Sequence, residues 1–327
     1  MDILSVVASS ANSLFFCLTS LLLLTGAGAG RRADFRHGGF PKFPVLGGSA
    51  LEVSKTGGGQ KNVHVYKTVT CGRVATPRIV GGGAAAYGNH PWQAVIEMYR
   101  SGEGFIHHCG GVIISSRYVL TAAHCLQNFG LSRHDYRIKV GDHNLGKPDQ
   151  DEQMFEIEDL VIHPKFAVGG QYNNDVAVLK VREQRGEGFR MSRFVTPACL
   201  PAPDTSYTPG ISCQVSGWGF TDPNNDYSKP KVLHSTDVLL VADKECQQLH
   251  GTRGYGPGMV CAGHPDGIKD ACNADSGGPL ACNINGSYTV FGLVSWGKGC
   301  GKPGLPGVYT HIQYYVDWIN SVTGNIQ

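Results

Sequence analysis

The chain has 327 residues, of which 41% are hydrophobic and 17% charged, and its formal net charge at pH 7 is +2. Whole-chain disorder does not fit this apolar content, a nucleic-acid binder does not fit the small net charge, and the 45 glycines follow no collagen-like period. Many glycines and few charges favour a β-rich protein with many tight turns.

The first 29 residues have the features of a signal peptide. Leu14 to Leu24 is a mostly apolar run, and Ala27-Gly28-Ala29 is a small-residue cleavage pattern. An uncleaved membrane anchor is the alternative, but polar residues interrupt the stretch, and Arg31-Arg32 would hold the following chain in the cytoplasm. We therefore expect residues 1–29 to be removed and the protein to be secreted and extracellular, without membrane attachment.

Residues 30–78 form a basic, glycine-rich segment. They contain nine Lys and Arg residues against two acidic ones, a net charge of +7, whereas residues 79–327 hold the other 19 basic residues against 23 acidic ones, a net charge of −4. The segment shows neither a helical nor a strand period. We expect a propeptide or light chain that behaves as a solvated tail, with binding to an anionic surface as the alternative.

Ten cysteines remain once Cys17 leaves with the signal peptide. An even number in an oxidising compartment predicts a disulfide framework. Because the chain contains no C-x-x-C pair, a zinc ribbon is a poor alternative. The count alone does not give the pairing.

From Ile79 onward, short apolar runs alternate with Gly, Pro, Asn and Asp. This spacing predicts an all-β sandwich or barrel, with helices over residues 314–322 and 242–249. The runs that we expect to be strands are Tyr118–Leu120, Tyr136–Val140, Val176–Val181, Val238–Val241, Tyr288–Trp296 and Val308–Ile312.

Three segments contain the residue types of nucleophilic catalysis. His124 lies among small residues beside Cys125, Asp175 precedes an apolar strand, and Ser276 precedes two glycines. A serine hydroxyl is a weak nucleophile unless an adjacent base takes its proton and a third group orients that base. Each residue alone is a weak signal, but the three together in these contexts indicate a catalytic triad.

With these motifs, residues 79 to about 319 resemble the trypsin-like (chymotrypsin-fold) serine proteases. The resemblance implies a protease domain over residues 79–327, with two six-stranded antiparallel β-barrels near residues 79–195 and 200–312 and the site between them. It also implies that Ser276 attacks the peptide carbonyl, His124 is the general base and then the general acid, and Asp175 orients His124. The alternative is a non-catalytic relative.

The same family suggests that the protein is a zymogen. Arg78-Ile79-Val80-Gly81-Gly82 resembles an activation site cut after Arg78 by another protease, after which the free ammonium of Ile79 would pair with Asp275. By resemblance the leader would stay attached to the protease domain through a disulfide. The implied pairs are Cys71–Cys199, Cys109–Cys125, Cys213–Cys282, Cys246–Cys261 and Cys272–Cys300.

Substrate specificity is also implied by resemblance. Asp270 corresponds to the floor of the family's specificity pocket, and Gly297 and Gly307 correspond to its walls. A carboxylate at that depth selects a cationic side chain, and arginine can engage it with two hydrogen bonds. Ala271 lacks a hydroxyl that helps many relatives to hold lysine, so we expect arginine to be preferred.

Three further residues have family roles near the pocket. Ser295 is expected to support Asp175, and Trp296 with Tyr172 is expected to shape the neighbouring substrate subsites. We expect protein or peptide substrates with arginine at the cleaved bond, protein protease inhibitors as further partners, and no nucleic acid.

One position departs from the family motif. Ala274 stands where relatives have a glycine whose N–H forms the oxyanion hole with that of Ser276. Alanine keeps the N–H but disfavours a positive φ. We expect an active but slowed enzyme. The alternative is a catalytically impaired homologue that acts as a binding or regulatory protein.

Two surface features complete the expectations. Asp142 and Glu152 bracket a loop that matches a calcium-binding loop of some relatives, so a structural calcium ion is the alternative to a merely solvated loop. No cofactor is expected to be required. Asn285-Gly286-Ser287 is a glycosylation sequon in an expected hairpin turn, which predicts a glycoprotein.

Overall fold

The computed structural model describes residues 70–74, 83–127, 132–205, 207–220, 225, 228–252, 254–267, 275–299 and 301–326. The predicted signal peptide, the cleavage site at Arg78-Ile79 and the pocket segment 268–274 lie outside these residues. Within the described ranges, neither helix has the length and apolar character that would carry it across a membrane.

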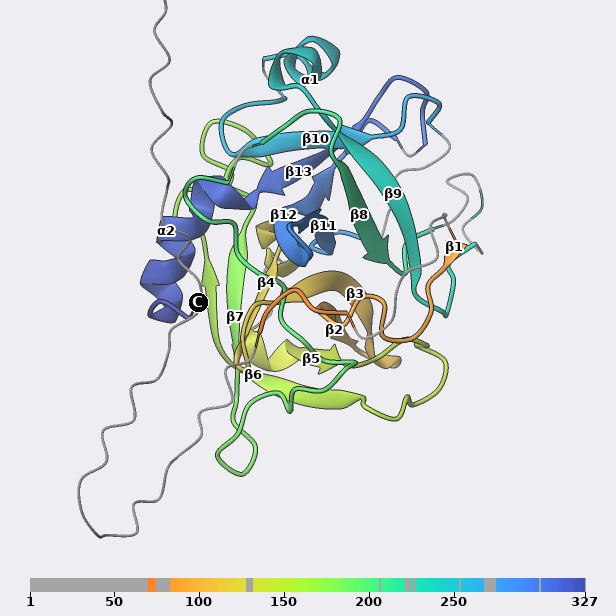
Figure 1. Ribbon diagram of the computed structural model, residues 1–327. Coiled ribbons are helices and arrows are strands. Elements are labelled where there is room, and N and C mark those ends of the chain that lie inside the picture. Colours follow the sequence, from red (N-terminus) through yellow and green to blue (C-terminus); the bar gives the residue numbers. More distant parts are fainter. Residues whose placement is uncertain are drawn as a thin grey trace, which may run out of the picture. The chain divides into compact units, whose positions relative to one another are not determined.

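Two closed antiparallel barrels of six strands each make up the described fold, which confirms the predicted all-β architecture (Figure 1). The first barrel has the order β2-β3-β4-β7-β6-β5. Its strands are β2 (Gln93–Arg100), β3 (Gly104–Ile113), β4 (Tyr118–Thr121), β5 (Tyr136–Val140), β6 (Gln153–Ile162) and β7 (Ala177–Val181).

The second barrel has the order β9-β10-β13-β12-β11-β8, and pairing between β8 and β9 closes it. The short strand β1 (Gly83–Ala84) pairs with the first two residues of β9. The strands of this barrel are β8 (Ser212–Gly217), β9 (His234–Val241), β10 (Met259–Gly263), β11 (Pro279–Ile284), β12 (Ser287–Trp296) and β13 (Gly307–His311).

The pleat explains why these runs form strands. In β5, Tyr136, Ile138 and Val140 are buried and the two residues between them are partly exposed, which is the period of two that a half-buried strand requires. Each barrel has its own apolar core, and a third cluster around Trp92 and Leu120 packs residues of both barrels together. The barrels are therefore joined through buried side chains.

Both predicted helices are present. Helix α1 (Asp243–His250) lies beside β10, and helix α2 (Ile312–Thr323) packs on β12. In α2, Tyr315 and Ile319 are buried one turn apart, and the helix ends at Gly324, whose φ of +78° is the left-handed conformation common after a helix.

Disulfides hold the loops and the leader to this fold. The bridge Cys71–Cys199 joins the described end of the leader to the body, and the Gly72 N–H donates to the Pro197 carbonyl at 2.7 Å. The structure contains four of the five pairs that the resemblance implied: Cys71–Cys199, Cys109–Cys125, Cys213–Cys282 and Cys246–Cys261. The expected pair Cys272–Cys300 lies outside the described residues.

Candidate active site

His124 and Asp175 come together at one end of the first barrel. His124 lies in the 3₁₀ helix Ala123–Leu126, directly after β4, and Asp175 lies just before β7, the strand that pairs with β4. This pairing brings the ends of the two strands side by side. His124 Nδ1 lies 2.8 Å from Asp175 Oδ2, and the backbone N–H of His124 donates to Asp175 Oδ1 at 2.9 Å.

Asp175 is completely buried and fully satisfied by hydrogen-bond donors. The side chain has no exposed surface, and Ser295 Oγ donates to Oδ2 at 2.5 Å. Burying an ion without such partners would be costly. With Nδ1 facing the carboxylate, the other ring nitrogen of His124 is left to face a substrate, and 24% of the histidine side chain is exposed.

Thr310 is a residue that the sequence analysis missed. Its Oγ1, on β13 of the second barrel, donates to the Asp175 backbone carbonyl at 2.6 Å. A threonine on a strand is common, and nothing in the sequence links it to a loop 135 residues away. The contact ties the orienting acid to both barrels.

Ser276 lies just before β11 of the second barrel, and backbone contacts hold its segment against the first barrel. The Gly110 N–H on β3 donates to the Ser276 carbonyl at 2.8 Å, and Gly277 is pressed against the segment before His124. A Cβ at Gly277 would lie 2.2 Å from Thr121 Oγ1, and its φ is +76°, so only glycine fits this approach. This glycine therefore holds the segment that contains Ser276 against the segment that precedes His124.

The serine hydroxyl is not bonded to the imidazole in this conformation. Hydrogen bonds among the described residues do not include one between Ser276 Oγ and His124. Catalytic hydrogen bonds are often long before substrate binds. The backbone contacts place the two residues in neighbouring segments, and proton transfer between their side chains stays a prediction.

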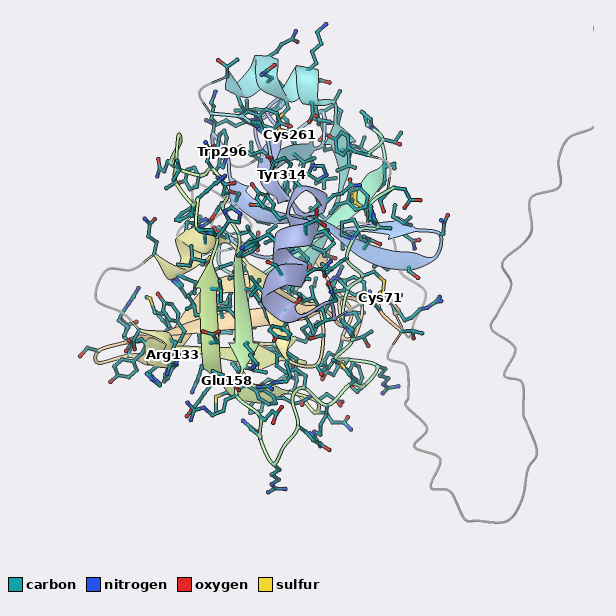
Figure 2. The ribbon with its side chains drawn as sticks, turned by 90° about the vertical axis from the view of Figure 1, so that its left-hand side faces the viewer. Cys71, Arg133, Glu158, Cys261, Trp296 and Tyr314 are labelled. Atoms are coloured by element: carbon teal, nitrogen blue, oxygen red, sulfur yellow. A yellow bond between two sulfur atoms is a disulfide. The ribbon has the colours of Figure 1, made fainter. Side chains whose placement is uncertain are left out.

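An aromatic wall lies on one side of His124. The Tyr172 ring meets the His124 ring edge to face at 5.8 Å and stacks on Trp296 at 6.0 Å, and Trp296 in turn contacts His250 at 5.1 Å. Figure 2 shows Trp296 near Cys261 and away from the first barrel's outer strands. Tyr172 therefore flanks the histidine and Trp296 packs behind Tyr172, while their role in shaping subsites stays a prediction.

Of the remaining predicted site residues, some lie within the ranges that the structure describes and others do not. Gly297 follows β12 and Gly307 begins β13, opposite Ala262 of β10. Asp275 accepts a hydrogen bond from the Gly219 N–H at 2.7 Å. Its expected partner Ile79 lies outside the described residues, as do Arg78, Asp270, Ala271 and Ala274, so their roles stay predictions.

In the predicted calcium loop, the side-chain ammonium of Lys139 lies among the carboxylates. The Lys139 ammonium lies 2.8 Å from Asp142 Oδ2, 3.4 Å from Glu97 Oε1 and 3.7 Å from Glu152 Oε1. Burial raises the pKa of Asp142, and Lys139 acts against that rise. Because the ammonium already sits among the carboxylates that calcium would need, the residues do not fit a calcium ion as they stand. Calcium binding, expected from the sequence, stays a prediction that would require Lys139 to leave these carboxylates.

Asn285 lies where the sequon was expected. It is exposed and, with Gly286, makes the two-residue turn between β11 and β12, with φ values of +51° and +85°. These are the dihedrals of the Asn-Gly hairpin turn. The turn leaves the amide side chain accessible, and glycosylation itself stays a prediction.

Comparison with known proteins agrees with this geometry. A family model described as Trypsin matches residues 79–319. The chain is 37% identical over 247 residues to the human hepatocyte growth factor activator serine protease, covering 75% of this chain and 36% of that protein. It is 37% identical over 259 residues to the dog protein of similar name, covering 76% and 38%.

A third relative is the human transmembrane protease serine 5, which is 38% identical over 255 residues, covering 76% of this chain and 53% of the relative. The matched region thus spans between about a third and a half of the relatives' own lengths.

Proposed function

Because the chain belongs to the trypsin family, we propose that it is a serine endopeptidase that cleaves peptide bonds after arginine by an acyl-enzyme mechanism. The observation that supports this most is the buried carboxylate of Asp175, which binds His124 through both its oxygens while Ser276 arrives from the other barrel. A buried acid orienting a partly exposed imidazole is what a weak hydroxyl nucleophile needs.

The reaction follows from these positions. Ser276 Oγ bonds to the substrate carbonyl carbon as its proton passes to His124 Nε2. His124 then gives that proton to the leaving amine as the C–N bond breaks. Water, activated by the same imidazole, hydrolyses the ester and restores the serine. Backbone N–H groups of Ala274 and Ser276 are the proposed donors to the oxyanion.

Arginine specificity rests on the resemblance around the pocket. We assign the cationic side chain to Asp270, with Ala271 disfavouring lysine and with Gly297 and Gly307 leaving the pocket open. The test is to compare kcat/KM on paired peptide substrates that differ only in Arg or Lys at the cleaved bond. We expect Arg to be preferred, and the Ala271→Ser variant to narrow the difference. Equal values for the two substrates would contradict the assignment.

We propose that cleavage after Arg78 activates the protein and that the new Ile79 ammonium pairs with Asp275. The activator would be another protease, and protein protease inhibitors would regulate the product. N-terminal sequencing of the activated protein should start at Ile79. An Arg78→Gln chain should stay intact and inactive under the same treatment, and full activity in that chain would contradict the proposal.

Secretion, a cleaved signal peptide at residues 1–29 and glycosylation at Asn285 belong to the same proposal. One group of relatives takes its name from activating a growth factor. By analogy, the substrates here would be protein precursors cut at chosen arginines.

The decisive test is an arginine-directed phosphonate on the cleaved chain, which should label Ser276 covalently. The Ser276→Ala chain is the control and should not be labelled. The runner-up function, a catalytically impaired homologue that acts as a binding or regulatory protein, has the departure at Ala274 in its favour. If correctly cleaved and folded protein stays unlabelled, that alternative holds.

The Ala274→Gly variant measures the effect of the extra methyl group. We expect turnover on arginyl substrates to rise, by less than the 10²–10³-fold loss that follows complete removal of an oxyanion donor. An unchanged turnover would show that the methyl group is accommodated.

A further inference from the structure

The first barrel has a hollow of about 510 Å³ that the proposed catalysis does not use. Its floor includes the buried side chains Tyr136, Phe155 and Ile157, and its rim includes Arg133 and Arg182. The mouths of β-barrels are common places for binding sites. This hollow combines an apolar floor with a basic rim.

The hollow lies at the opposite end of the barrel from the candidate active site. Strand β7 begins two residues after Asp175 and ends one residue before Arg182. At about 3.3 Å per residue, Asp175 and Arg182 are separated by roughly 20 Å along the strand. Figure 2 shows Arg133 at the outer edge of the first barrel, far from Trp296. A molecule bound there would not touch the reacting atoms.

The charges of the rim are only partly neutralised. Arg182 pairs with Glu156 at 3.5 Å, but both side chains are more than half exposed, and such pairs contribute little. In the part of the chain that the structure describes, no carboxylate pairs with Arg133. Residues 79–327 have a net charge of −4, so the basic rim is opposite in sign to the net charge of this part of the chain.

Apolar groups extend the surface beyond the hollow. Met154 is 48% exposed and lines both this hollow and a neighbouring one of about 430 Å³. The second hollow is lined by two arginines, Arg185 and Arg190, and by two glutamates, Glu152 and Glu187, so the excess of positive charge lies at the first hollow. The Arg137 guanidinium lies 4.3 Å from the centre of the Phe105 ring. Met, Arg and aromatic residues are the types enriched in protein interfaces. The two hollows share three lining residues and so form one extended surface.

We propose that this end of the first barrel binds an acidic segment of a protein substrate in which Asp and Glu flank large apolar side chains. The carboxylates would engage Arg133 and Arg182, and the apolar side chains would cover Met154 and the floor. An extended chain needs at least about six residues to cover 20 Å. The segment therefore lies well away from the cleaved bond and selects among substrates that share an arginine there.

The substrate role rests on the proposed protease function, so binding is tested without catalysis. The probe is a fluorescent 12-residue peptide that alternates Glu or Asp with Leu and Phe. A matched control peptide has Gln or Asn in place of every Glu or Asp. Fluorescence anisotropy on the full-length Ser276→Ala chain should show saturable binding of the acidic peptide, weakening as salt rises, and at least tenfold weaker binding of the neutral one.

Variants of the protein test whether the peptide binds at this surface. Arg133→Glu with Arg182→Glu should weaken binding of the acidic peptide at least tenfold, and Met154→Asp should weaken it severalfold. The charge-matched control is Lys147→Glu with Lys244→Glu, two exposed lysines outside the surface, and it should bind within twofold of the parent chain. Thermal unfolding midpoints of all variants should match, because every changed side chain is exposed.

Three results would overturn the proposal. The acidic peptide could fail to bind, the neutral peptide could bind equally well, or the control pair could lose as much affinity as the arginine pair. Each outcome is independent of whether the phosphonate labels Ser276, so a failure here is distinguishable from a failure of the proposed function.

Discussion

Two buried carboxylates in the first barrel have opposite surroundings. Asp175 receives the His124 backbone N–H, the His124 ring and the Ser295 hydroxyl, and its ring partner is 24% exposed. Asp142 receives the Lys139 ammonium, which is 12% exposed, and its Oδ1 has no hydrogen-bond partner among the described residues. The difference teaches that burial and pairing do not make a catalytic site. The partner must also be a group that can accept and release a proton, and it must reach a substrate.

The largest expected effect separates the two acids directly. Asp175→Asn should lower turnover of the activated protein on an arginyl substrate by about 10⁴-fold, the loss that this change causes in the serine-protease triad, because the imidazole takes the wrong tautomer. Asp142→Asn is the matched control, a buried carboxylate without a catalytic partner, and should keep turnover within threefold. Equal losses in the two variants would remove the distinction.

His107 extends the comparison to a buried group without a neutralising partner. Its ring nitrogens are buried and make no hydrogen bond among the described residues, and the charged groups near it are Lys229, His108 and Lys139. Burial, with these cations, lowers the pKa of His107 to about 3. The unfolded chain therefore takes up a proton below about pH 6.5 that the folded chain refuses.

The neutral ring should make the fold acid-sensitive. Its contribution is fully present above pH 6.5 and declines as the pH falls toward 3. Between pH 7 and pH 5 the wild type should lose about 2 kcal/mol more stability than the His107→Gln variant in urea unfolding. The exposed His134→Gln variant should behave as wild type. Parallel losses in wild type and His107→Gln would contradict the assignment.

Ser295 should have a smaller effect, through Asp175. Removing a hydrogen bond to a charged group usually costs about 1.5–3 kcal/mol, so Ser295→Ala should lower kcat about tenfold with little change in KM. Ser295→Thr keeps the hydroxyl and should recover most of the turnover. Ser321→Ala, on the exposed side of α2, should have no effect. A change confined to KM would place Ser295 in substrate binding instead.

The smallest expected effect concerns the Asp142 loop. The thermal unfolding midpoint of the wild type should be the same in calcium and in EDTA, because the Lys139 ammonium already pairs with the Asp142 and Glu152 carboxylates. Lys139→Met removes the internal cation, and calcium should then raise the midpoint by a few degrees. A calcium-dependent wild type would show that the ion displaces the lysine and would restore the expectation drawn from the sequence.

Local patterns were enough for much of the fold and for selecting the three candidate triad residues, two of which the structure brings into contact. The run Tyr136–Val140 reads as a strand because its inward and outward residues alternate within five positions. His124, Asp175 and Ser276 each lie in a short distinctive motif. Three-dimensional pairings were not predictable in this way. Lys139 meets Glu97 from β2 and Glu152 from a loop, and no local spacing reports that meeting.

The same limit applies to supporting residues and to surfaces. Thr310 contacts Asp175 only because β13 of one barrel runs past a loop of the other. The hollow at Arg133 exists because the start of β5 and the end of β7 share one end of a closed barrel. Their residue types are ordinary in sequence, and only barrel closure gives them a common surface.

The bridge between Cys71 and Cys199 has a practical consequence for anyone following maturation. A single cut between residues 75 and 82 leaves both polypeptides joined by sulfur, so the molecule's mass in a non-reducing gel or on a sizing column hardly changes. Only after a thiol reagent opens the bridge do the two pieces migrate separately. Samples that look uncut by size can thus be fully processed, and the new amino terminus is the reliable marker.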